Sequence, residues 1–190
     1  MNLPIDLPNP GASAQDVLDF WFGDGLRCDW PSTDHQPLWF GGGAEQDEAI
    51  RRRFGALVES ALNGGLTDWE RTPRTRLALL IVLDQFSRNV HRGQARAFIG
   101  DARAQQLVLA ALAAGADTRL ARVGCVFLYM PLMHAEDLAL QERCVACFTA
   151  LHIHSPPALH EKLASNLHFA VEHRDTYQPL GRFPCPLYPS

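Results

Sequence analysis

An uninterrupted apolar run that ends in polar and charged residues is the strongest constraint on how this 190-residue chain can fold. The run covers residues 77–83, and residues 84–89 (DQFSRN) follow it directly. A segment this apolar belongs in the centre of a fold, so the polar residues after it must be hydrogen-bonded or face a cleft. Thr72 and Pro73 are typical of a helix start, and only two residues of the run are β-branched. We therefore predict a central helix over residues 73–88 rather than a buried strand.

The rest of the sequence predicts further helices and no strand. Helical spacing of apolar residues, together with N-caps and Gly or Pro breaks, predicts helices over residues 13–22, 44–62, 101–115, 119–130, 136–151 and 156–171. Residues 1–12 are predicted to be an extended leader, residues 23–43 a loop and residues 182–190 an irregular tail. The predicted fold is a single all-α domain over residues 1–190, an array of seven to eight antiparallel helices.

Composition excludes several classes of function. The net charge is -4 and the pI is near 6.0, whereas a protein that binds nucleic acid through phosphate contacts usually carries a basic surplus. The N-terminal residues lack the basic and apolar regions of a signal peptide, and no apolar run approaches the ~20 residues of a membrane span. We predict a cytoplasmic protein that binds neither nucleic acid nor a membrane.

The five cysteines do not predict a disulfide framework, because their number is odd and their spacing is scattered. Cys144 and Cys147 form a C-x-x-C pair, but no second pair at zinc-ligand spacing accompanies it. On a helix these two residues are neighbours, where small buried thiols are common. We predict no cofactor.

Three polar clusters lie beside apolar segments. The first holds Asp84, Gln85, Arg88, Asn89, Arg92 and Arg96, the second His134, Glu136, Asp137, Gln141 and Glu142, and the third His173, Tyr177 and Arg182. Asp84 and Arg88 are spaced i, i+4, as in a helical ion pair. A helix that begins near His134 would place His134, Asp137 and Gln141 on one face.

These clusters leave three functions open. A binding module for a peptide or a small anionic ligand is the function we predict, with the arginines as a clamp. Its predicted ligand-binding residues are Gln85, Arg88, Asn89, Arg92, Arg96, Glu136, Gln141, His173 and Arg182. One alternative is an enzyme acting on a small polar substrate, with His134 as acid or base and Asp84 or Asp137 as catalytic candidates. The other is a structural network that fixes how the helices stack.

Two further hypotheses from the sequence are a metal site and self-association. His134, Glu136, Asp137 and His173 are residue types that bind divalent metals, but no metal-binding motif matches their spacing, so we predict no metal. The aromatic groups Phe20, Trp21, Phe22, Trp39 and Phe40 are either core or the surface of a homodimer.

Four separated motifs resemble one bacterial family. They are VLDFWFG (17–23), LDQFSRN (83–89), ARAF (95–98) with Asp101, and FLYMPLMHAED (127–137) with Gln141 and Glu142. In this order they resemble the domain-of-unknown-function family DUF924, from Val17 to Pro184. The resemblance implies a tetratricopeptide-like (TPR-like) α-α superhelix, and it implies no reaction.

The chain departs from the family pattern at three places. The family usually has proline at Ser87 and serine at Ala135. After Pro184 it tends to continue with a His-Arg-Asn stretch, whereas this chain continues with Cys185. If that stretch completes a site in the family, the resemblance implies an altered site here.

Overall fold

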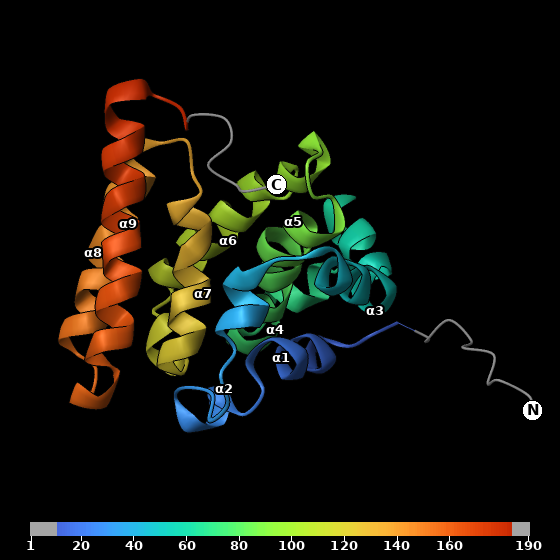
Figure 1. Cartoon of the computed structure of the whole chain (residues 1–190), viewed down its shortest axis with the longest axis horizontal. Coiled ribbons are helices and arrows are strands. Elements are labelled where there is room, and N and C mark those ends of the chain that lie inside the picture. Colours follow the sequence, from blue (N-terminus) through green and yellow to red (C-terminus); the bar gives the residue numbers. More distant parts are fainter. Residues whose placement is uncertain (1–10, 184–190) are drawn as a thin grey trace, which may run out of the picture.

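The computed structural model describes residues 11–183 and shows an all-helical fold (Figure 1). Within those residues there are nine α-helices and no strand, which confirms the predicted fold class. The α-helices are α1 (Ala14–Phe22), α2 (Gly25–Cys28), α3 (Ala44–Leu62), α4 (Pro73–Leu80), α5 (Ser87–Val90), α6 (Asp101–Ala113), α7 (Arg122–Met133), α8 (Leu138–Ile153) and α9 (His160–Leu180). Short helical turns join them: η1 (Pro37–Gly41), η2 (Thr67–Glu70), η3 (Ile81–Phe86), η4 (Ala95–Phe98), η5 (Asp117–Arg119) and η6 (Pro157–Leu159). Most of the predicted leader and tail lies outside the described residues.

The central helix is the core of the molecule, as predicted, but it is not a regular α-helix. Between α4 and α5 the segment η3 is a π-helix, and the Ser87 N–H donates to the Val82 carbonyl five residues earlier. Residues 77–83 are at most 1% exposed. A π segment turns the residues after it relative to those before it, and such segments are frequent at functional sites. No sequence pattern indicates this π segment, because a run that is apolar on every side has no period that an extra residue could interrupt.

The helices on the C-terminal side form a layer beside the central helix (Figure 1). α7 packs against α4 on one side and against α8 on the other, and α9 packs mainly on α8. Figure 1 shows α8 and α9 side by side at one edge of the molecule, with α7 between them and the remaining helices. The connection from α7 to α8 and the end of α9 therefore lie near the polar end of the central helix. The TPR-like superhelix stays a prediction.

Several predicted boundaries are wrong. α7 begins at Arg122 and continues through Pro131, because residues 123–133 are all buried and their packing outweighs the loss of one backbone hydrogen bond. α9 begins at His160 after the turn η6, not at Pro156, and it extends to Leu180. The predicted loop over residues 23–43 contains α2 and η1.

The N-terminal aromatic residues are mostly core. Trp21 and Phe22 are at most 1% exposed, and Trp39 donates its indole N–H to the Trp21 carbonyl oxygen at 2.8 Å. Trp21 and Phe22 both contact the Phe127 ring edge-on. They are not available as a dimer surface, and a homodimer built on these residues would have to use Phe40, which is 56% exposed.

Gly100 sets how closely the start of α6 approaches the central helix. Its Cα is so close to η3 that a methyl group on it would lie 2.8 Å from the Leu83 carbonyl oxygen. Asp101 follows immediately, so this approach also brings the Asp101 carboxylate to Arg88. A side chain at position 100 would push these two segments apart.

We expect Gly100→Ala to lower the free energy of unfolding by about 1–3 kcal/mol, because the added methyl overpacks a buried contact. Gly55→Ala is the matched control. Gly55 lies within α3, and a methyl group there meets only the Arg51 Cγ, at 3.7 Å. It should raise the free energy of unfolding by roughly 0.5–1 kcal/mol, since alanine is the better helix former. Urea denaturation followed by circular dichroism measures both, and equal effects of the two substitutions would contradict the close approach.

Candidate functional site

The central polar group is the Asp84 carboxylate, which is buried at the end of the apolar run. Asp84 is 1% exposed and lies in the π-helix η3. Its Oδ1 contacts the His134 Nδ1 at 2.7 Å and the Arg88 Nη1 at 3.1 Å. Its Oδ2 accepts a hydrogen bond from the Gln85 side-chain amide at 2.5 Å. Both carboxylate oxygens are thus bound, as burial of a charge requires.

Arg88 joins this carboxylate to a second one. Its two terminal nitrogens donate to the Asp101 oxygens at 3.0 and 2.9 Å, in the bidentate geometry that guanidinium and carboxylate groups favour. Its Nη1 also donates to the Asp84 carbonyl oxygen at 2.7 Å. The guanidinium carbon lies 5.3 Å from the centre of the Phe98 ring. Arg88 therefore ties α6 to the central helix.

The two carboxylates have opposite electrostatic surroundings. Burial would raise the pKa of Asp84, but the charges of His134 and Arg88 and the hydrogen bonds from His134 and Gln85 outweigh it and lower the pKa to about 2. Burial raises the pKa of Asp101 above its ordinary value, and the Asp84 charge adds to that effect against the attraction of Arg88. Arg88 lowers the pKa of both carboxyl groups, and His134 and Gln85 lower that of Asp84 further by hydrogen bonds.

His134 lies at the C-cap of α7 and not on the helix that carries Asp137 and Gln141, so the predicted common face is wrong. Asp137 is the N-cap of α8 and accepts the Leu140 N–H at 3.0 Å. Gln141 is buried and donates to carbonyl oxygens at the end of α7, those of Met133 and Ala135. Asp137 and Gln141 thus shape the turn that presents His134. Asp84, fifty residues earlier, is its acidic partner.

His173 of α9 brings the third predicted cluster to the same place. The centres of the His134 and His173 rings are 6.4 Å apart. The Phe183 ring contacts His173 at 5.8 Å and Tyr177 at 5.5 Å between ring centres. The Phe183 N–H donates to the Glu136 carboxylate at 3.0 Å. His173 therefore lies beside His134, and Phe183, in the turn after α9, contacts both His173 and Glu136.

The remaining predicted ligand-binding residues lie in other ion pairs. Asp47 of α3 accepts hydrogen bonds from Asn89 and Arg92, and Glu59 of α3 pairs with Arg96 and with His91. Three arginines of the predicted clamp are thus divided among four acids, which are Asp84, Asp101, Asp47 and Glu59. Arg182 is exposed. Sequence reasoning missed the roles of the last three of these acids and of Phe183, although Asp101 stands in one of the four motifs.

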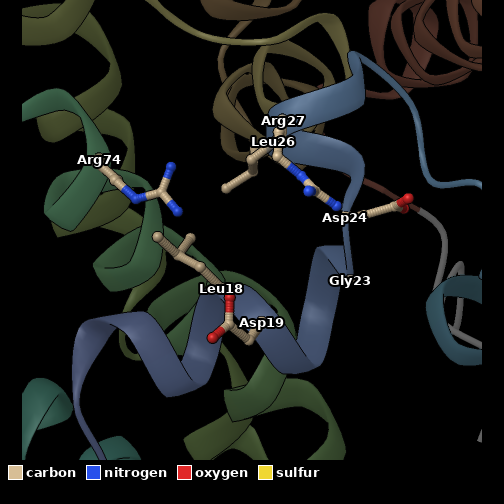
Figure 2. A pocket seen from close by; sticks show the side chains of 7 residues that line it. All are labelled: Leu18, Asp19, Gly23, Asp24, Leu26, Arg27 and Arg74. Carbon is tan, nitrogen blue, oxygen red and sulfur yellow. The ribbon is translucent and has the colours of Figure 1, made fainter.

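Two surface hollows lie away from His134. A hollow of about 370 Å³ lies between α1, α2 and α4, and Figure 2 shows Arg74 and Arg27 on opposite sides of it, above Leu18. Both arginines are exposed, and Asp19 and Asp24 line the same hollow, so the charges there are mixed. A second hollow of about 590 Å³ includes Arg27 and the segment 118–122. Neither hollow includes a residue of the three polar clusters.

Among residues 11–183, no group of three or more His, Cys, Asp or Glu side chains has an arrangement that would hold a metal ion. In the same part of the chain, no helix combines the length and the apolar character needed to cross a membrane.

Two comparisons place the chain among known proteins. The family model described as a bacterial protein of unknown function, DUF924, matches residues 17–185. A solved structure of a protein of unknown function from Agrobacterium tumefaciens is similar, with 32% sequence identity, a TM-score of 0.72, and coverage of 90% of this chain and 85% of that one. No curated protein matches the sequence. The chain belongs to the bacterial family of unknown function DUF924.

Proposed function

We propose that this protein is an enzyme that uses His134 as a general acid and base on a small polar substrate. The observation that carries the proposal is the 2.7 Å contact between the His134 Nδ1 and the buried Asp84 carboxylate. A histidine held by a carboxylate is the arrangement in which an imidazole is fixed for proton transfer. A carboxylate with a pKa of about 2 accepts hydrogen bonds only, so the Nδ1 carries the hydrogen. Proton exchange with a substrate then takes place at Nε2.

The charges around His134 favour a neutral polar substrate. The net charge of the ion-pair group is -1, since it contains two carboxylates (Asp84 and Asp101) and one guanidinium (Arg88). The nearby Glu136 adds a second negative charge. The terminal nitrogens of Arg88 are bound to Asp101, which makes this guanidinium a poor site for a substrate anion. A substrate with hydroxyl or amide groups meets no repulsion there, whereas a carboxylate or phosphate would.

A second candidate function, the binding of a peptide or protein partner, has one observation in its favour. Phe169 and Leu180 are 51% and 56% exposed, and they are eleven residues apart on α9. Eleven residues are close to three helical turns, so the two side chains share one face. An amphipathic partner helix could cover that face.

We expect His134→Asn to lower kcat/KM by roughly 10²–10⁴-fold, because asparagine occupies similar space but cannot exchange a proton near neutral pH. The measurement is a screen of the wild-type protein against neutral esters, amides, glycosides and acetals, followed by kinetics of the variant on whatever is turned over. Far-UV circular dichroism confirms that the variant is folded.

His154→Asn is the matched control, since His154 is the C-cap of α8 as His134 is of α7, but is exposed. It should leave kcat/KM unchanged. Equal turnover by the wild type and His134→Asn across the screen would contradict the proposal and leave a structural network as the role of His134.

The stability contributed by Asp84 should disappear in acid. Its pKa in the folded protein is about 2 against 3.8 in the unfolded chain, so its contribution is complete above pH 3.8 and is lost as the pH falls toward 2. We expect the difference in unfolding free energy between the wild type and Asp84→Asn to shrink as the pH falls below about 4. Urea denaturation at a series of pH values measures this difference.

For Asp101→Asn we expect the opposite pH dependence of the unfolding free energy. The pKa of Asp101 is raised in the folded protein, so its ionised form destabilises the fold. The wild type should gain stability relative to Asp101→Asn as the pH falls through that raised pKa. Parallel pH profiles for the two variants would contradict the distribution of charge described for this site.

A further inference from the structure

A second imidazole lies beside His134, fixed in the same tautomer. We propose that His173 is the second proton-transfer group of this site, so that the two histidines act as one acid and one base on opposite sides of a bound substrate. The inference rests on the proposed function of His134 and adds the partner group that a two-proton reaction needs. The helix α9, which carries His173, would then take part in the same reaction as α7.

Hydrogen bonding fixes the tautomer of both rings. The His173 Nδ1 lies 2.8 Å from the Phe169 carbonyl oxygen, one turn earlier on α9. A carbonyl oxygen only accepts, so the His173 Nδ1 carries the hydrogen and the lone pair of the neutral ring is on Nε2. His134 is held in the same way through its Nδ1 by Asp84. Each ring is therefore anchored at one nitrogen and exchanges protons at the other.

The two rings are too far apart for a direct hydrogen bond between their nitrogens. Their centres are 6.4 Å apart and their planes are inclined by 57°. A ring nitrogen lies only about 1 Å from its ring centre, so no pair of nitrogens comes within the ~3.2 Å of a direct hydrogen bond. Proton transfer from one ring to the other therefore needs a water molecule or a polar group of a substrate between them.

The surroundings of the two rings differ, and this difference assigns their roles. The protonated form of His134 has the buried Asp84 carboxylate as its counter-ion. Burial is the main cause that lowers the pKa of His173, and the Phe169 hydrogen bond opposes it. The charge of His134 lowers this pKa further, against a smaller opposing effect of Glu172 on the same helix. The other acid nearby is Glu136, on the connection from α7 to α8, and it accepts the Phe183 N–H. Groups with surroundings this different serve as separate acid and base.

The proton balance of the reaction follows from this assignment. The neutral His173 Nε2 takes a proton from an O–H or N–H group of the substrate, and the electron pair of that bond remains on the substrate. The protonated His134 Nε2 gives its proton to another substrate atom, and the electron pair remains on the imidazole. The two Nε2 atoms together carry one proton before and after the step. A water molecule returns the proton from His173 to His134 once the product leaves.

The test uses the full-length protein labelled with ¹⁵N-histidine, and it needs no substrate. NMR chemical shifts identify which ring nitrogen carries the hydrogen, and a pH series gives the pKa of each histidine. We expect neutral His173 to be the Nδ1–H tautomer with a pKa below the ordinary value. In His134→Asn the pKa of His173 should rise but stay below the ordinary value, because the His134 charge is gone while burial, the larger cause, remains. His173→Asn assigns the resonances.

His154→Asn again serves as the control and should leave the pKa of His173 unchanged. An Nε2–H tautomer of His173 in the wild type would overturn the proposal, and that measurement needs no variant to fold. A His173 pKa that does not respond to His134→Asn would overturn it as well. Either result would overturn the role of His173 without affecting the kinetic test of His134. Turnover that is insensitive to His134→Asn would instead contradict the proposed function, and the effect of His134 on the pKa of His173 could still be observed.

A pH profile distinguishes proton transfer from mere support once a substrate is found. We expect kcat/KM of the wild type to rise and then fall with pH, with one limb for each histidine. His173→Asn should lose the limb that reports the base, while a purely structural role would lower activity at all pH values alike.

Discussion

The burial of the Asp84 carboxylate is the constraint on which the arrangement of this fold depends. A charge at the end of a fully apolar helix is unfavourable unless cations and hydrogen-bond donors surround it. His134 from the end of α7 and Arg88 from the next turn of the same helix supply them. Arg88 in turn binds Asp101 at the start of α6. One buried charge thus fixes where α6 and α7 meet the central helix.

Local features of the fold could be predicted from the sequence, and non-local ones could not. The helix predicted from Ser13 to Phe22 is present as α1, with Ser13 as its N-cap and Asp16 completing the capping box. The apolar run is the core helix. The π segment η3, the passage of α7 through Pro131 and the late start of α9 depend on packing against other helices, which outweighs local propensity. No pattern within ten residues carries that information.

The candidate site shows the same division. The sequence indicated Asp84, His134 and His173 as polar groups beside apolar segments, and all three are brought together. It did not indicate which arginine pairs with which acid, because Asp101, Asp47 and Glu59 are each separated from their partners by thirteen to forty-five residues. Residue type predicts the need for a partner, whereas only the fold selects the partner.

A structural lock alone would not call for a histidine at this position. Arg88 already joins Asp84 to Asp101 and holds α6 on the central helix, with a charge that does not change over the physiological pH range. Histidine is the residue whose charge does change there, so a lock that includes His134 is less constant than one without it. Departures from what stability alone favours are expected at functional sites. His173 lies beside His134 and is anchored through the same ring nitrogen. This shared arrangement favours proton transfer over a purely structural role.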